Sequence, residues 1–271
     1  MKSLRLLFIA AFSVVCLSGC LQIEKIVKLK PDGSGTIEET LTMSKETAAR
    51  LKEMAASFGK PAGGKKGAAA DSGLLNEKKL REEADTMGAG VKFVSAKKID
   101  TDKLQGFTAV FSFADINKLK LDQNPGSALS TVGGAKGGPG QSKNEPLLFH
   151  FTKGSPAELD ITMPESKMPP KPQSDDAQAM AMQAMQQIFK DMKITIAFEF
   201  QGSITETNAE YREGSRVTLM EMDFNKLLAN PEKFKDLAKG NPQSLQESKG
   251  LLKGLPGVKI ETAPEITVKF E

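Results

Sequence analysis

The sequence predicts an α+β fold with a mainly antiparallel sheet. Apolar and polar residues alternate in several short runs, which is the period of a half-buried strand. These runs come in pairs around turn-rich loops, as in β-hairpins, and helical patterns lie between and after the pairs. Few stretches alternate single strands with helices, so parallel βαβ units are not expected to dominate the fold.

The first twenty residues are typical of a cleaved export signal. Lys2 and Arg5 precede an apolar run over residues 6–16. That run is too short to cross a bilayer as a helix, but it has the length of the apolar region of a secretory signal peptide. We therefore expect residues 1–19 to be removed from the mature protein.

The signal ends in Leu17-Ser18-Gly19-Cys20. An aliphatic residue, two small residues and a Cys resemble the lipobox of bacterial lipoproteins. The resemblance implies cleavage between Gly19 and Cys20, a diacylglyceryl group held by the Cys20 sulfur as a thioether, and acylation of the freed amine, for example with palmitate. Each buried methylene contributes about 0.8 kcal/mol, so two or three acyl chains anchor a protein durably. The alternative is a soluble secreted protein in which Cys20 occurs by chance.

The mature chain has 252 residues, enough for one large or two small domains. Its 35 basic residues face 34 acidic ones, which argues against nucleic acid as a partner and against strong electrostatic attachment to anionic lipid. Cys16 leaves with the signal and Cys20 is acylated, so no thiol remains for a disulfide, a Cys-ligated metal or covalent catalysis. We expect two α+β regions, residues 20–121 and 147–271, joined by a Gly-rich linker over residues 122–146 and packed as one body.

The first hairpin is predicted from residues 21–29 and 37–43. Apolar residues recur with period two in both runs, around Pro31-Asp32-Gly33-Ser34-Gly35. This loop has some likeness to a calcium or phosphate loop, but one Asp supplies too few oxygen ligands and no helix follows the glycines directly. Turn chemistry alone explains its residues.

Two helices are predicted next. Ser44 is the expected N-cap of a helix over residues 45–58, and Asn76 that of a helix ending at Met87. In the second helix, Glu77 is spaced to pair with Arg81. The stretch between the two helices is low in bulky residues and predicts a linker.

Three more hairpins are predicted from paired runs of period two. They comprise residues 91–99 with 107–113, 147–151 with 159–163, and 194–200 with 216–224. A short strand around Ile204 and a final strand over residues 266–270 complete the strands, and the Gly-rich residues 123–145 are expected to form a long loop. Phe107, Phe111 and Phe113 share one face, which favours core packing over an aromatic ligand pocket.

Three further helices have capping signals. One runs from Ser174 or Asp175 to about Met192. Asn230-Pro231 and Asn241-Pro242 each place an N-cap residue before a Pro at the first helical position, which predicts two short helices.

No catalytic residue, metal site or cofactor is predicted. The only histidine, His150, lies mid-strand on the face opposite the apolar residues and no nucleophile-elbow motif accompanies it, so we expect a surface residue. The residue count excludes zinc sites built from His and Cys, and no Gly-rich loop is placed as in a nucleotide site. Adjacent carboxylates point apart, so we expect solvated charges at three pairs, namely Glu38-Glu39, Glu82-Glu83 and Asp175-Asp176.

One methionine cluster supports an alternative function. Met180, Met182 and Met185 offer three thioethers, and thioether sulfur suits Cu(I). On a helix, however, Met182 lies about 200° around the axis from Met180, so the three sulfur atoms do not converge. Core-filling or lipid-facing methionine is the better interpretation.

The body of the chain also has a family resemblance. The Asp-Gly-Ser-Gly hairpin soon after Cys20, followed by a helix and paired strands, resembles the LppM-type domain of some bacterial lipoproteins. This resemblance implies no catalytic residues in the present chain. We expect a non-enzymatic protein, anchored in the cell envelope through Cys20, that binds a protein partner or an apolar ligand such as lipid at the membrane face. Leu21 rather than Asp after Cys20 implies, by analogy with other lipoproteins, the periplasmic side of the outer membrane in a cell with two membranes.

An enzyme of unknown reaction stays open as another alternative. It requires a cleft with a carboxylate of shifted pKa, and a buried cluster of Asp or Glu would favour it. A lipid-binding module predicts a cavity lined by Phe and Met, whereas a solid core would favour a scaffold.

Overall fold

The computed structural model describes residues 21–49, 75–122, 145–164, 192–229 and 244–271. The predicted export signal, with Gly19 and Cys20, lies outside these residues. So do the predicted linkers, the Asn230-Pro231 helix, Asp175-Asp176 and the Met180 cluster.

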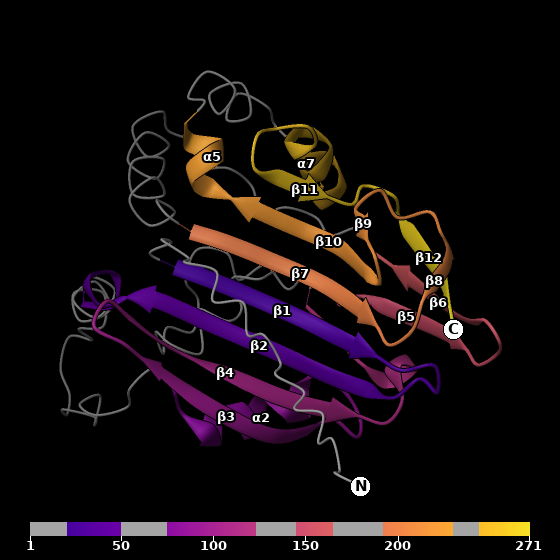
Figure 1. The fold of residues 1–271 in the computed structure, drawn as a ribbon, viewed down its shortest axis with the longest axis horizontal. Coiled ribbons are helices and arrows are strands. Elements are labelled where there is room, and N and C mark those ends of the chain that lie inside the picture. The colour runs from indigo at the N-terminus through magenta and orange to yellow at the C-terminus, as the bar shows by residue number, and fades with distance from the viewer. Residues whose placement is uncertain (1–20, 50–74, 123–144, 165–191, 230–243) are drawn as a thin grey trace, which may run out of the picture.

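A large sheet is the centre of the fold (Figure 1). Its strands lie in the order β11-β10-β7-β1-β2-β4-β3, with β9 paired to β10. Their bounds are β1 (Leu21–Leu29), β2 (Gly35–Ser44), β3 (Lys92–Asp100), β4 (Leu104–Phe113), β7 (Met192–Phe200), β9 (Arg212–Glu213), β10 (Arg216–Asp223) and β11 (Val258–Ile260). The predicted α+β class with mainly antiparallel pairing is confirmed.

One pair of strands in the large sheet is parallel. β1 pairs with β7 from Leu21 opposite Met192 to Leu29 opposite Phe200. Strands from the first and last parts of the chain therefore share one hydrogen-bonded sheet. Long separation in sequence is normal for such a pair, because parallel strands cannot be joined by a tight turn.

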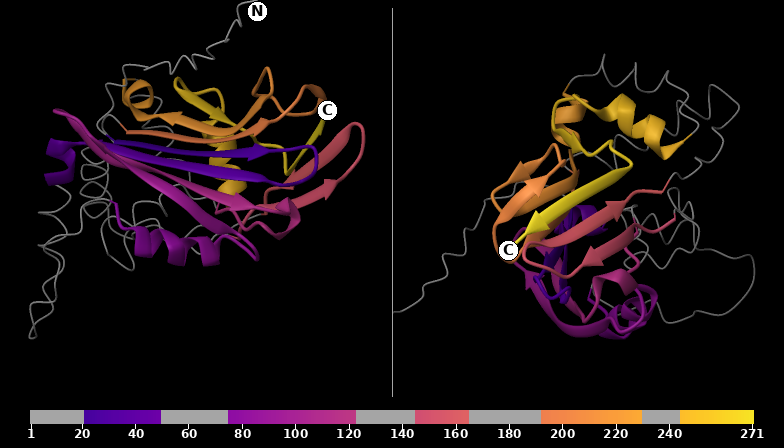
Figure 2. Two further views of the ribbon diagram at one scale, coloured as in Figure 1. Left: turned by 60° about the horizontal axis from the view of Figure 1, so that its bottom comes forward. Right: turned by 90° about the vertical axis from the view of Figure 1, so that its right-hand side faces the viewer.

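A second, four-stranded sheet has the order β5-β6-β12-β8. Its strands are β5 (Leu148–Thr152), β6 (Ala157–Thr162), β8 (Ile204–Thr207) and β12 (Glu265–Phe270). The predicted 147–151/159–163 hairpin, the strand around Ile204 and the final strand are all confirmed. Figure 2 shows this small sheet and helix α2 on the same side of the large sheet.

The core lies where the two sheets face each other. Phe200 of β7 packs on Phe270 of β12 with ring centroids 4.8 Å apart, and Phe198 lies 5.8 Å from Phe149 of β5. Each aromatic pair of this kind contributes about 0.5–1.5 kcal/mol beyond the area it buries. The predicted core role of Phe107, Phe111 and Phe113 is confirmed, since all three are buried.

The loop between β1 and β2 is a turn, as predicted. The Asp32 carboxylate accepts hydrogen bonds from the backbone N–H and the hydroxyl of Ser34, at 2.9 and 2.7 Å. Gly33 has a φ of 86°, a conformation that glycine adopts without steric cost. The carboxylate is therefore occupied within its own turn.

Helix α2 (Glu77–Thr86) confirms the prediction made from Asn76. The Asn76 side chain accepts a hydrogen bond from the Lys79 N–H at 3.1 Å, and Arg81 pairs with Glu77 at 3.6 Å. Leu80 and Ala84 are buried against the large sheet. Residues 45–49 are helical as well, and the Ser44 hydroxyl accepts from the Thr47 N–H at 3.0 Å, which confirms Ser44 as an N-cap.

Three short helices complete the described residues: η1 (Ile116–Lys118), α5 (Phe224–Leu228) and α7 (Leu245–Leu252). The predicted N-cap Asn241 and Pro242 lie outside the described residues. Ser244 caps α7, its hydroxyl accepting from the Glu247 N–H at 3.1 Å. Ser followed three residues later by Glu is a capping-box pattern.

Two more observations concern helical segments. Met192, expected near the end of a helix, is instead the first residue of β7. Among the described residues, no helix is both long and apolar enough to cross a membrane.

Candidate functional site

The predicted anchor residue lies one residue before the described fold. Gly19 and Cys20 are outside the described residues, while Leu21 is already the first residue of β1 and is 1% exposed. Leu21 is paired with Met43 on one side and Met192 on the other. The sequence after Cys20 thus enters a central strand with no residue between them.

A buried ion pair lies in the middle of the large sheet. Lys25 of β1 and Glu39 of β2 stand directly opposite each other, with 3.5 Å between Nζ and Oε2. Lys25 is 8% exposed and Glu39 2%, on the same face as the apolar residues of their strands. Two charges have therefore been placed where the fold otherwise puts aliphatic side chains.

The prediction that Glu39 and Glu83 are solvated is wrong. In the two described pairs, Glu38-Glu39 and Glu82-Glu83, one carboxylate points outward and the other is turned toward the core. Glu38 lies on the outer face with Lys28, and Glu82 is exposed. Glu39 faces inward because successive side chains of a strand point to opposite faces, and Glu83 lies on the part of α2 next to the buried Leu80 and Ala84.

Electrostatics hold Lys25 in its charged form. Burial by itself lowers the pKa of Lys25, but the charges of Glu39, Glu83 and Asp122 outweigh that effect and leave the pKa above its usual value. The Glu39 Oε2 atom is buried and accepts no hydrogen bond from the described residues. A buried oxygen without a hydrogen bond lowers the stability of the folded state by about 1–3 kcal/mol, unless water or another group donates to it.

Glu83 of α2 is the titratable member of this charge cluster, which we define as Lys25, Glu39 and Glu83. Burial, with a smaller contribution from the charge of Glu39, raises the pKa of Glu83 from 4.5 to about 7 against the opposing effect of Lys25. One lysine faces two carboxylates, so near neutral pH the cluster exchanges a proton. The arrangement can store or release that proton.

A second buried lysine lies at the other side of the molecule. Lys249 of α7 is 4% exposed, and its ammonium donates to the Met163 sulfur at 3.2 Å. Burial lowers the pKa of Lys249 to about 8, and Glu261 opposes this only in part. Glu261 is itself buried and accepts a hydrogen bond from the Tyr211 N–H at 3.0 Å.

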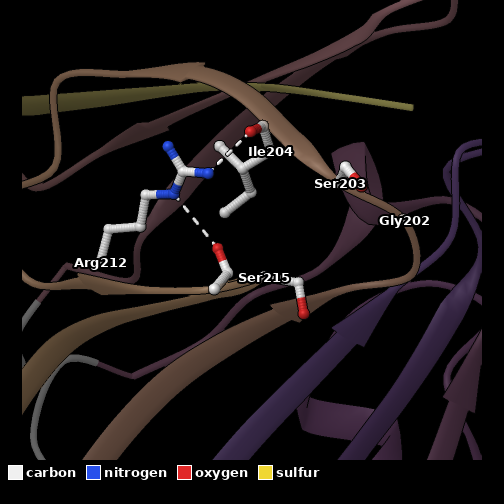
Figure 3. A pocket seen from close by; sticks show the side chains of 6 residues that line it. Gly202, Ser203, Ile204, Arg212 and Ser215 are labelled. Carbon is white, nitrogen blue, oxygen red and sulfur yellow. Dashed lines mark hydrogen bonds between the residues drawn. The ribbon is translucent and has the colours of Figure 1, made fainter.

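A pocket of about 360 Å³ lies where the chain passes from β7 of the large sheet to β8 of the small one (Figure 3). The Arg212 guanidinium points across it and donates to the carbonyls of Ile204 and Gly214, at 2.8 and 3.1 Å. Ser203 and Ser215 are the hydroxyl residues of the lining. Arg212 thus ties β9 of the large sheet to β8 of the small one.

This pocket does not have the lining expected of an active site or of a lipid cavity. Its six residues comprise no Phe, Met, His or carboxylate; they are Gly202, Ser203, Ile204, Arg212, Gly214 and Ser215. Among the described residues, no group of three or more His, Cys, Asp and Glu side chains is placed to hold a metal ion.

His150 lies on the surface, as predicted. It is exposed on β5, opposite Asp160 of β6, whose carboxylate accepts a hydrogen bond from the Thr267 hydroxyl at 2.6 Å. Asp160 therefore orients Thr267, on the outer face of the small sheet.

The sequence contained an overlooked signal for the buried ion pair. The apolar stripe of β1 skips position 25, and that of β2 skips position 39. A hairpin closed over residues 30–34 places these two gaps opposite each other. A Lys and a Glu at matched gaps in two apolar stripes predict a buried pair. The position of Glu83 beside them has no such local signal.

Comparisons with known proteins give little guidance. No family model matches the chain, and no curated protein matches it. The chain is similar to the folded domain of the Mycobacterium tuberculosis protein LppM, solved by NMR, with 12% identity and a TM-score of 0.30 over 100% of this chain and 95% of that one. A TM-score of this size does not establish a shared fold.

Proposed function

We propose that this chain is an exported, lipid-anchored protein of the cell envelope that binds a protein partner or an apolar ligand at the membrane face, without catalysis. One observation carries the proposal. Leu17-Ser18-Gly19-Cys20 follows a basic start and an apolar run, and the folded body begins at the next residue, Leu21.

The physical basis is the energy of acyl chains in a bilayer. Each buried methylene contributes about 0.8 kcal/mol, so a diacylated or triacylated Cys20 stays in the membrane without any basic patch. The mature net charge of +1 fits an anchor of this kind. In a cell with two membranes, Leu21 after Cys20 favours the outer membrane.

The described polar sites are the buried charges and the pocket at Arg212. The buried charges lie within the core, whereas the pocket at Arg212 lies at another place and its lining has no acid or base that titrates near neutral pH. Among the described residues, the exposed large apolar side chains occur singly on separate elements, namely Val94 on β3, Leu148 on β5 and Leu251 on α7. Scattered residues of this kind do not mark a docking patch.

The anchor is tested by replacing the thiol. With Cys20→Ser, we expect loss of palmitate labelling, loss of cleavage before residue 20, and release from sedimenting envelope fractions. The matched control is Cys16→Ser, which removes the other thiol four residues earlier and leaves labelling intact. Labelling of the Cys20→Ser protein, or none on the unaltered protein, would contradict the proposal.

The ligand is tested on the protein as extracted from membranes. Mass spectrometry of material that co-purifies with the acylated protein should detect a stoichiometric lipid or protein, depending on the class of ligand. Detergent extracts of a second, unrelated lipoprotein from the same cells serve as the control for lipid carried over by the anchor. Identical co-purifying material in both extracts counts against a specific ligand.

A second candidate, an enzyme of unknown reaction, is favoured by one observation. Glu83 has a pKa near 7 beside Lys25 and Glu39, which is the kind of perturbed group that active sites contain. A panel of chromogenic esters, phosphates and glycosides would test it. Turnover that disappears in Glu83→Gln, but not in Glu82→Gln, supports this candidate.

Copper binding remains a separate hypothesis that rests on sequence alone. A Cu(I) titration of the exported protein would test it, with Met182 and Met185 changed to Leu. An affinity that does not change on substitution removes the hypothesis.

A further inference from the structure

The anchored strand is the middle strand of the large sheet. Three strands lie on each side of β1, which are β7, β10 and β11 on one side and β2, β4 and β3 on the other. At about 4.8 Å per strand, the sheet extends roughly 14 Å to either side of β1. A tether at the start of β1 therefore holds the sheet near the centre of one end.

We call this end the Leu21 end. It also contains the last residue of β2, the first residues of β4 and β7, and the last residue of β10, which are Ser44, Leu104, Met192 and Asp223. The opposite end, which we call the Leu29 end, contains the β1–β2 turn (Figure 1). The pocket at Arg212 also lies there, since its residues Gly202 and Ser203 lie just after the end of β7. β1 has nine residues, so the two ends are roughly 26 Å apart along the strand.

We propose that the protein stands upright on the bilayer, with the Leu21 end resting on the phospholipid headgroups and the Leu29 end directed into the aqueous space. This inference rests on the proposed lipid anchor at Cys20. It names the surface that meets the membrane, which the anchor alone does not.

The absence of a spacer is the first argument. Consecutive Cα atoms are 3.8 Å apart, so an acylated Cys20 in the headgroup layer brings Leu21 to the same level. Leu21 cannot swing independently, because it is buried and paired with Met43 and Met192 in the sheet. A rigid sheet attached by one short link follows the position of that link.

Width is the second argument. Wings of roughly 14 Å on both sides of the tether meet the membrane surface before the sheet can tilt far in its own plane. Lying flat would instead turn β1 by about a right angle at the Cys20–Leu21 link. It would also press the charged outer face on the headgroups, including the Lys28–Glu38 pair at 2.8 Å.

Charge does not drive the orientation. Three lysines of the Leu21 end each have a carboxylate partner: Lys45 with Asp100 at 3.1 Å, Lys193 with Glu221 at 3.6 Å and Lys226 with Asp223 at 3.6 Å. A surface with this mixture of signs suits zwitterionic lipid. Added salt or anionic lipid should therefore leave the orientation unchanged.

The orientation also determines which ligands reach the pocket at Arg212. The pocket lies at the Leu29 end, so it faces water roughly 26 Å from the headgroups. A ligand there is a soluble molecule or part of another envelope protein, and an apolar ligand of the membrane would meet the Leu21 end instead.

Single-cysteine labelling tests the orientation directly. The mature chain has no thiol except Cys20, which acylation blocks, so one introduced Cys takes up one fluorophore. We choose Lys103→Cys in the β3–β4 turn at the Leu21 end, Ser95→Cys on the outer face of β3, and Lys153→Cys in the β5–β6 turn at the Leu29 end; all three positions are exposed. The acylated protein is placed in phosphatidylcholine vesicles that carry a nitroxide on the headgroup.

We expect headgroup quenching to be strong at position 103, weak at 95 and absent at 153, with and without high salt. Strongest quenching at position 95 would mean that the sheet lies flat and would overturn the proposal. Equal quenching at all three positions would overturn it as well, because the body would then have no preferred orientation.

A spacer variant is the matched control. Ten Gly and Ser residues inserted between Cys20 and Leu21 span about 18 Å on average, so the gradient of quenching should disappear while the protein still floats with the vesicles. Flotation also separates the two hypotheses. A protein that fails to float contradicts the anchor, whereas one that floats without a gradient contradicts the orientation alone.

Discussion

The two buried lysines show how much a carboxylate partner decides. Lys25 and Lys249 are almost equally inaccessible, at 8% and 4% exposure. Yet the pKa of Lys25 is raised, while that of Lys249 is lowered to about 8. Burial lowers both pKa values, so the difference comes from their surroundings.

Lys25 has Glu39 at 3.5 Å on the neighbouring strand, and two more carboxylates contribute. Lys249 instead donates to a thioether, which is a weak acceptor, and Glu261 compensates only in part. Glu261 is also held by the Tyr211 N–H, so its charge is shared. We infer that the first lysine is part of the native architecture and that the second is a local cost to stability.

The largest expected effect is at Lys25. Lys25→Met leaves Glu39 buried without its cation, which typically costs about 3–5 kcal/mol. The free energy of unfolding at pH 7, from urea denaturation in a Cys20→Ser background, should fall by that amount. Adding Glu39→Leu should recover most of the loss, because an uncharged pair needs no compensation.

The same substitution three residues later is the control for this prediction. Lys28 pairs with Glu38 at 2.8 Å, but both side chains are about one third exposed. Lys28→Met should cost less than about 1 kcal/mol. Equal losses at positions 25 and 28 would show that the burial of the pair is unimportant.

At Lys249 we expect that replacing the lysine raises the free energy of unfolding, whereas at Lys25 it lowers it. The pKa of about 8 in the folded state lies below the usual lysine value of 10.5, so the folded protein holds the proton less tightly. Stability should therefore rise as pH increases from about 8 to about 10.5, and the full cost is present below pH 8. Lys249→Met should raise the free energy of unfolding at pH 7 by about 1–3 kcal/mol.

The measurement is urea denaturation at pH 7 and at pH 10.5. The gain in stability from Lys249→Met should be present at pH 7 and should nearly vanish at pH 10.5. Loss of stability at pH 7 would mean that the lysine is a needed partner of Glu261. The comparison between the two lysines would then fail.

The smallest expected effect concerns Glu83. Its pKa is raised from 4.5 to about 7, so the folded state binds the proton more tightly. The stability that this provides is present below pH 4.5 and is lost as pH rises to about 7. Glu83→Gln should remove that pH dependence and stabilise the protein at pH 8 by about 1–2 kcal/mol, since the side chain is partly exposed.

Urea denaturation between pH 4 and 8 checks this prediction, with the adjacent Glu82→Gln as the control. Glu82 is largely exposed and its pair with Lys78 is long, at 4.0 Å. The control should follow the unaltered protein at every pH. A parallel shift of both variants would indicate a general effect of charge on the molecule rather than the cluster with Lys25 and Glu39.

Sequence patterns predicted most of the local structure, because the signals are local. Alternation in β1, β4 and β7 identified each strand and its buried face, and Asn76 and Ser44 identified two helix starts through side chains that accept from the next turn. The Ser244 cap of α7 was not predicted, although Ser is among the preferred N-cap residues.

The charge cluster required more than alternation. Lys25 and Glu39 each interrupt the apolar alternation of their strand. Because one turn sets the register of the hairpin, the two interruptions could have been matched and the pair identified from the sequence. Glu83 reaches them only because α2, almost fifty residues further on, packs on the same face. The inward turn of one carboxylate in each of the two described pairs was therefore missed.

By itself, the sequence determined the strand and helix segments and the buried face of each, and it predicts an export signal with a lipobox-like end. Only the tertiary structure decided that β1 pairs in parallel with β7, that β8 and β12 belong to a second sheet, and that one lysine meets two carboxylates under α2. The physical reason is range. Alternation, capping and turns depend on neighbours within a few residues, whereas the pairing of distant strands depends on which surfaces bury each other best.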